Sequence, residues 1–155
     1  MGHQDRRNAE LAANARWVRI DLERLGDVGE APQSELDPER HYLEGSTEDV
    51  ASYMLTLDAI NFGSGWFPTL RKRVGSSGYF TIAWALADRW RAGAGWTSAQ
   101  LRAMRTEEVA DTLGQARDHE LMALFAQALR ELGRFLGPRR ALDVVAEARG
   151  SALRL

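Results

Sequence analysis

The segment from Leu57 to Pro68 carries the side chains best suited to binding a small molecule. Asp58 precedes Asn61 by three residues, so in a helix the two side chains lie on one face. A carboxylate accepts hydrogen bonds and an amide both donates and accepts them, so this pair could bind the polar edge of a ligand. Three aromatic rings with flat faces suited to stacking follow them, and these are Phe62, Trp66 and Phe67.

Each of these residues also has a purely structural interpretation. Asp58 and Asn61 could satisfy backbone groups at a helix end, and clustered aromatic rings are often part of a core. One basic cluster is either a phosphate site or a solvated loop, and it consists of Arg71, Lys72 and Arg73. Four further polar or aromatic residues have simple structural roles: Tyr79 and Trp84 in the core, and His119 and Glu120 at a helix start.

The composition excludes several kinds of site and partner. The chain has no cysteine, which rules out disulfides and thiolate metal sites, and its three histidines lack the spacing of a metal-binding pair. A formal net charge of −2 provides no general attraction to nucleic acid. The Gly63-Ser64-Gly65 turn lacks the lysine of a phosphate loop, and no serine has a histidine–aspartate pattern near it. We therefore expect no cofactor, no metal and no direct nucleic-acid partner.

The N-terminal composition and the hydropathy favour a cytoplasmic location. Met1 to Glu10 is polar and charged, unlike a secretory signal, and no apolar run approaches the ~18 residues that a membrane span needs. The absence of cysteine suits a reducing compartment. We expect a cytoplasmic protein with no membrane contact, and the sequence does not indicate its oligomeric state.

Periodicity and capping residues predict the helices that position the candidate site. From Ser46 to Ile60, apolar residues recur every three or four positions behind a serine N-cap. The turn at Gly63–Gly65 ends this helix, and Pro68 argues against a helix before it. The stretch from Tyr79 to Arg91 is apolar nearly all round, which predicts a helix in the middle of a bundle.

Further signals predict an all-α, compact multi-helix domain without a significant sheet. Helix starts are expected at Thr97 (in a capping box with Gln100), Thr106, Asp118, Pro138 and Ser151, and Gly114 is expected to be a left-handed stop. Residues 5–15 predict a helix, residues 17–20 an extended or irregular piece, and residues 26–45 a loop with one helical turn after Asp37-Pro38. We expect a single domain over residues 1–155, with an N-terminal helix and irregular segment at 1–45 and a helical core at 46–155.

With these elements in place, the candidate segment resembles the queuosine salvage protein family. The matching residues are Leu57-Asp58-Ala59-Ile60-Asn61-Phe62, Trp66 and Ser77-Gly78-Tyr79, and the later helices follow the family's order. The resemblance extends over the chain after about Asp37, and more loosely over Trp17 to Asp21. Members of this family are queuosine 5′-phosphate N-glycosidases, which act in the salvage of a tRNA modification.

The resemblance implies a glycosylase-like helical architecture and hydrolysis of the N-glycosidic bond of queuosine 5′-phosphate to release queuine. Asp58 and Asn61 would bind the edge of the deazaguanine base. Phe62, Trp66 or Phe67 would stack on the base, and Arg71 or Lys72 would face the phosphate. Tyr79, from the family's Gly-Tyr pair, joins them as a substrate-binding residue. We expect a single pocket beside the Gly75–Tyr79 loop.

Two departures from the family pattern affect these expectations. Gly63-Ser64-Gly65 separates Asn61-Phe62 from Trp66, whereas many members have the tryptophan almost directly after Asn-Phe. Family members are also longer, and their later half carries a lysine and an aspartate that resemble the catalytic pair of helical DNA glycosylases. Ser151–Leu155 matches the point where the family chain continues. We therefore expect the N-terminal part of a longer chain, with unknown catalytic residues and little activity alone.

Two other functions are compatible with the same residues. The chain could be a non-catalytic helical binding or interaction module that keeps the family's fold. It could also be a plain helical domain in which the aromatic segment only packs. Binding of queuine separates a base-recognition site from the plain helical domain, because only a recognition site would retain the base.

Overall fold

The computed structural model describes Asn14 and residues 36–149 of the 155-residue chain. The chain divides into two units, Met1–Glu35 and Leu36–Leu155, and the helical core belongs to the second. Helices take up 62 % of the described residues, which contain no strand, and this confirms the all-α prediction. Apart from the helical Asn14, the features expected over 1–35 and at Ser151 lie outside the described residues, and the single domain stays a prediction.

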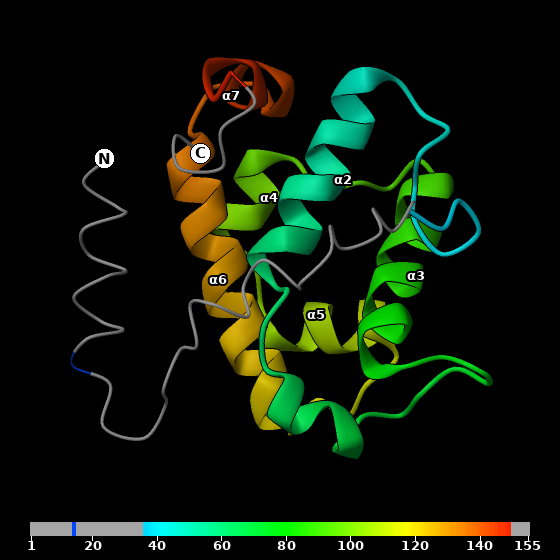
Figure 1. Ribbon diagram of the computed structural model, residues 1–155. Coiled ribbons are helices and arrows are strands. Elements are labelled where there is room, and N and C mark those ends of the chain that lie inside the picture. The colour runs from blue at the N-terminus through cyan, green and yellow to red at the C-terminus, as the bar shows by residue number, and fades with distance from the viewer. Residues whose placement is uncertain (1–13, 15–35, 150–155) are drawn as a thin grey trace. The chain divides into compact units, whose positions relative to one another are not determined.

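Two antiparallel helices, α2 (Thr47–Ala59) and α3 (Gly78–Arg91), flank the segment that carries most of the candidate site (Figure 1). As predicted, Ser46 caps α2, because its hydroxyl accepts a hydrogen bond from the Asp49 backbone N–H at 3.1 Å. Ser77 caps α3 in the same way. The buried hydroxyl of Tyr53 in α2 donates to the backbone carbonyl of Ala83 in α3 at 3.1 Å, so it pins the two helices together.

The longest helix, α6 (Glu120–Leu136), packs against α4 (Ser98–Arg102), α5 (Thr106–Leu113) and α2. Its apolar face is buried in the core, as its periodicity predicts. Gly133 lets α4 come unusually close, since a Cβ built there would lie 2.5 Å from the backbone nitrogen of Arg102. The short α7 (Ala141–Glu147) then packs against α2 at the opposite end of the domain from the start of α6 (Figure 1).

The predicted caps of α4 and α5 are confirmed. Thr97 and Gln100 form a reciprocal capping box before α4, because the threonine hydroxyl accepts from the Gln100 backbone N–H and the Gln100 side chain accepts from Thr97. Helix α5 begins at Thr106, and Gly114 ends it in a left-handed conformation with a φ of +65°. The turn expected after Asp37 is also present, since the His41 backbone N–H donates to the Asp37 carbonyl at 2.9 Å.

Two predictions about prolines are wrong. A 3-10 helix, η2 (Ser64–Thr69), contains Pro68, although that residue was expected to exclude helix. The backbone bonds that close η2 are donated by Trp66 and Leu70, so the missing N–H of proline removes neither of them. Pro138 lies in a turn rather than in the first turn of α7, because that helix begins where the Glu48 carboxylate accepts from the N–H of Ala141.

Two further predictions about helices need correction. His119, not Asp118, caps α6, because the imidazole Nδ1 accepts from the Leu121 backbone N–H at 3.2 Å. Helix α3 is not enclosed on all sides, since Tyr79, Phe80 and Trp84 are each only partly buried. No helix in the described part of the chain is both long and apolar enough to span a membrane.

Candidate functional site

The two polar side chains at the end of α2 have no partners within the described residues. Asp58 lies in the last turn of α2, and its exposed carboxylate makes no hydrogen bond or ion pair there. Surrounding atoms of the same chain nevertheless displace part of the water around the carboxylate, and this desolvation raises the pKa of Asp58. Asn61 was expected on the same helix, but it lies beyond the C-cap residue Ile60, because α2 ends at Ala59. Asn61 is also exposed, and only its backbone N–H is used, in a bond of 3.1 Å to the Asp58 carbonyl. Neither side chain therefore satisfies a backbone group at the helix end.

Tyr79, in the first turn of α3, lies close enough to Asp58 for their charges to interact. Burial is the main cause that raises the pKa of Tyr79, and the negative charge of Asp58 raises it further. The tyrosine hydroxyl lies 3.0 Å from Nε2 of His41. Asp58 in α2 and Tyr79 in α3 thus lie near enough for this effect, although no hydrogen bond joins them.

The imidazole of His41 orients this hydroxyl. His41 is only 2 % exposed, and its Nδ1 lies 2.9 Å from the backbone carbonyl of Asp37, which can only accept a hydrogen bond. In the neutral ring Nδ1 therefore carries the hydrogen, and Nε2 accepts from the Tyr79 hydroxyl. The oxygen of Tyr79 keeps its lone pairs for another donor. His41 is absent from the sequence-based site, and the only signal near it is the Asp37-Pro38 turn.

The three aromatic rings of the segment lie against three different neighbours. Phe62 is 39 % exposed, and its ring meets Phe125 edge-to-face with centroids 5.1 Å apart. The indole N–H of Trp66 donates to the Glu120 carboxylate at 3.2 Å. Phe67 packs on the start of α3, where a Cβ at Gly78 would meet the Phe67 Cβ at 2.5 Å. Phe62, next to Asn61, is therefore the ring with the most face left for a ligand.

The basic cluster is divided between free and paired side chains. Arg71 and Lys72 are exposed, and neither forms an ion pair with another described residue. Arg73 instead pairs with Asp88 at 2.7 Å. The buried Gln115 holds the loop in place, since its amide accepts from the Arg71 N–H at 2.9 Å and donates to the Arg71 carbonyl at 3.1 Å. Gln115 is not among the site residues predicted from the sequence, because no local sequence pattern indicates its role.

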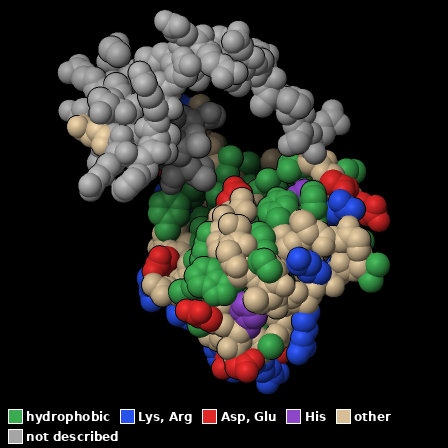
Figure 2. Space-filling view, turned by 60° about the horizontal axis from the view of Figure 1, so that its bottom comes forward, with side chains coloured by type: hydrophobic (Ala, Val, Ile, Leu, Met, Phe, Trp, Pro, Cys, Tyr) green, Lys and Arg blue, Asp and Glu red, His purple; other side chains and the backbone are tan. Residues whose placement is uncertain are grey.

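The structural interpretations of His119 and Glu120 are correct, and both residues also hold η2. His119 caps α6 through Nδ1, while its Nε2 lies 2.9 Å from the Thr69 hydroxyl. Glu120 accepts from Trp66. Figure 2 brings the η2 end of the molecule forward and shows hydrophobic side chains exposed there, with many of the charged ones toward the edge.

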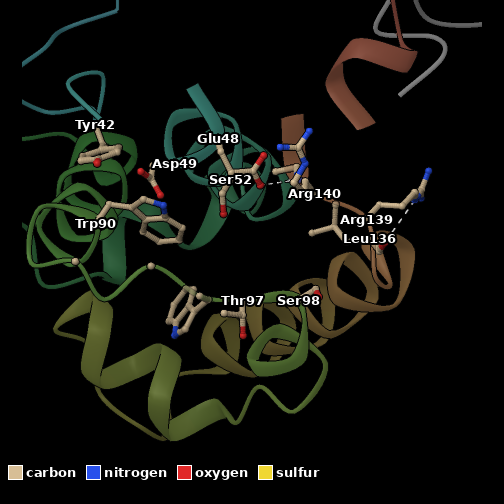
Figure 3. A pocket seen from close by; sticks show the side chains of 14 residues that line it. Tyr42, Glu48, Asp49, Ser52, Trp90, Thr97, Ser98, Leu136, Arg139 and Arg140 are labelled. Carbon is tan, nitrogen blue, oxygen red and sulfur yellow. Dashed lines mark hydrogen bonds between the residues drawn. The ribbon is translucent and has the colours of Figure 1, made fainter. Parts of the chain in front are cut away.

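A separate cavity of about 400 Å³ lies away from all of these residues (Figure 3). It opens between the start of α2, the α3–α4 connection and the α6–α7 connection, and its lining includes Tyr42, Asp49, Trp90 and Trp96. None of the site residues predicted from the sequence lines it. In the sequence, the feature that could have indicated this cavity is the pair Trp90 and Trp96, on either side of Gly93–Gly95. Nothing in the local sequence pattern distinguishes these two tryptophans from core residues.

The described part of the chain offers no arrangement that identifies a metal centre. No group of three or more potential metal-binding side chains occurs within residues 36–149 and Asn14. Comparison with protein-family models and with curated proteins finds no match to this chain.

Proposed function

We propose that the end of α2 and the start of α3 form the base-recognition site of a queuosine 5′-phosphate N-glycosidase. The observation that carries this proposal is the pair Asp58 and Asn61, on either side of the end of α2 and followed in the chain by the exposed ring of Phe62, with no side-chain partner among the described residues. Helix packing alone gives no reason to hold a partly desolvated carboxylate without a cation. A ligand with N–H donors on a flat ring would supply the missing partners.

The geometry supports a distinct role for each group. Asp58 accepts from the N–H edge of the base, and Asn61 offers both a donor and an acceptor to it. The ring of Phe62 stacks on the heterocycle, which is worth about 1–3 kcal/mol by analogy with single-strand recognition. Tyr79, oriented by His41, adds an oxygen that can accept one more hydrogen bond.

The basic loop suits the phosphate of the nucleotide. Arg71 and Lys72 follow η2 and are exposed enough to reach an anion, whereas Arg73 is occupied by Asp88. Arginine binds phosphate through two parallel N–H bonds, so it is the stronger candidate of the two. The proposal assigns recognition, not bond cleavage, to the described residues.

Calorimetric titration with queuine tests the recognition site. Wild type should bind queuine, and Asp58→Asn should weaken binding about tenfold or more, the loss expected for a charge-assisted hydrogen bond. Asp118→Asn is the matched control, because Asp118 is an exposed aspartate before α6 that has no partner among the described residues. Equal affinities for Asp58→Asn and wild type, or no binding at all, would refute the assignment.

A second titration separates base from phosphate recognition. Arg71→Gln should weaken binding of queuosine 5′-phosphate and leave queuine binding unchanged, because queuine has no phosphate. If Arg71→Gln weakens both ligands equally, the arginine supports the loop and does not contact the phosphate.

A further inference from the structure

The cavity away from the proposed base site is walled by a chain of aromatic rings. Tyr42 meets Tyr53 with ring centroids 6.0 Å apart, Tyr53 meets Trp90 at 5.8 Å, and Trp90 meets Trp96 at 6.0 Å. All three contacts are edge-to-face, with interplanar angles from 61° to 87°. Three of the four rings line the cavity, which gives it rigid, flat walls.

Two nearly buried donors in this wall have no partner among the described residues. Trp90 is 5 % exposed and its indole N–H makes no hydrogen bond, and Tyr42 is 8 % exposed with a hydroxyl that makes none. Figure 3 shows the indole nitrogen of Trp90 on the side of the ring that faces Asp49 and the cavity. Neither donor atom is among the described atoms that are fully buried without a hydrogen bond, so both are accessible from the cavity and available to a polar occupant.

Asp49 places a carboxylate at the same end of the cavity. Its described partner is the Ser46 hydroxyl, which donates to it at 2.5 Å, and no described cation pairs with it. The negative charge of Asp49 reaches Tyr42, where it adds to the effect of burial in raising the pKa of the hydroxyl.

The other charged residues of the lining are already occupied. Both oxygens of Glu48 accept from α7, one from the N–H of Ala141 at 2.9 Å and one from that of Leu142 at 3.1 Å. Arg140 pairs with Asp143 at 2.6 Å. Arg139, the remaining cation of the lining, is engaged by Glu147 and the end of α6. Neither carboxylate of this lining pairs with a described cation, but Glu48 has both oxygens occupied by α7, whereas the side-chain donor to Asp49 is the single hydroxyl of Ser46.

We propose that this cavity binds a small organic cation, a protonated amine with a neighbouring oxygen on a flat apolar body. The ammonium group pairs with the carboxylate of Asp49. The neighbouring oxygen accepts from the N–H of Trp90, and the apolar body lies against Trp96. The volume of about 400 Å³ is within the range of small-molecule sites. This proposal does not rest on base recognition at Asp58.

Three matched probes test the charge requirement: 2-amino-1-phenylethanol, the neutral 1-phenylethane-1,2-diol and the anion mandelate. They share a ring and a hydroxyl and differ in the group that would meet Asp49. Binding is followed by NMR on ¹⁵N-labelled protein, through the indole N–H signal of Trp90. This signal is assigned as the one that disappears in Trp90→Phe. The amine should shift this signal and bind about tenfold or more tightly than the diol, with mandelate weakest.

Two variants locate the effect. Asp49→Asn should abolish the preference for the amine, whereas Glu107→Gln, an acid in the first turn of α5 outside the lining, should keep it. Equal binding of amine and diol, tighter binding of mandelate, or no shift at Trp90 at millimolar amine overturns the proposal. If Asp49→Asn fails to fold, the three probes on wild type still decide. Queuine binding that depends on Asp58 is unaffected by either result, so the two proposals fail separately.

Discussion

The hydroxyl of Tyr79 lies 3.0 Å from Nε2 of His41, although 38 residues separate them in the chain. The other ring nitrogen of His41 is held by the Asp37 carbonyl at 2.9 Å, so the buried imidazole joins the turn before α2 to the start of α3. Both ends of this link are needed, because a buried imidazole nitrogen without a partner costs free energy.

Tyr79→Phe should therefore lower the free energy of unfolding by about 1–3 kcal/mol, the cost of leaving Nε2 of His41 unpaired. Tyr42→Phe is the matched control, since its hydroxyl has no partner among the described residues, and it should change stability by less than about 0.5 kcal/mol. Urea denaturation measures both. Equal effects of the two substitutions would mean that the His41–Tyr79 bond adds nothing.

The three tyrosines of the chain should all resist ionisation in the folded state. Burial raises the pKa of each above its ordinary value of 10.0, and these residues are Tyr42, Tyr53 and Tyr79. The folded state therefore holds their protons more tightly than the unfolded state does, and the stability they contribute is present below pH 10 and lost as pH rises above it. Tyrosinate absorbance should therefore appear at a higher pH in the folded protein than in the protein unfolded in urea. A step near pH 10 in a protein that remains helical would contradict this.

Asp58→Asn should make the domain slightly more stable at neutral pH. Desolvation raises the pKa of Asp58 above its ordinary value of 3.8, so the folded state disfavours the charged form. The penalty exists above the folded-state pKa and disappears as pH falls below 3.8, where both states are protonated. Because the side chain is exposed, the gain should not exceed about 0.5 kcal/mol.

Urea denaturation at a series of pH values measures this gain, which should shrink on acidification. Asp118→Asn should show no comparable gain, because that exposed aspartate lies before α6, where a negative charge is favourable. A stability loss in Asp58→Asn at neutral pH would make Asp58 a structural residue and would also weaken its assignment to the base site.

Glu48 should be essential for docking α7. Its carboxylate accepts from the first two backbone N–H groups of that helix, Ala141 and Leu142, from 93 and 94 residues away in the chain. Glu48→Ala should cost about 1–3 kcal/mol, since it leaves these donors without a partner. Hydrogen exchange should accelerate at Ala141 and Leu142. Glu107→Ala, in the first turn of α5, should leave the exchange in α7 unchanged.

Gly133→Ala should destabilise the domain although alanine favours helix. In an open helix this change would gain about 1 kcal/mol, but here the new methyl would lie 2.5 Å from the Arg102 nitrogen and 2.8 Å from the Leu101 Cβ. Because backbone cannot yield as a flexible side chain can, we expect a loss of about 1–3 kcal/mol. Gly65→Ala is the control, since nothing lies within 4 Å of its added methyl and thermal unfolding should barely change.

For the candidate base site, the sequence predicted the helix that carries Asp58 but not the neighbours of the aromatic rings. Periodicity placed Asp58 and Asn61 in one helix, but only Asp58 lies in α2, which ends before Asn61. Both side chains are exposed and have no partner among the residues that the structure describes. The rings were expected to meet in one pocket, but Trp66 lies against Glu120 and Phe67 against Gly78. A ring's neighbours come from other helices, so sequence spacing could not predict them.

The sequence by itself determined the helical class, the start of α2 at Ser46 and the capping box before α4, because these depend on residues within four positions of one another. Tertiary structure decided where α7 begins, because Glu48 supplies its cap from another helix. It also decided that His41 meets Tyr79 and that Tyr42, Asp49 and Trp90 surround one cavity. These groups approach only when the helices pack, and packing depends on the shape of the whole core rather than on any local pattern.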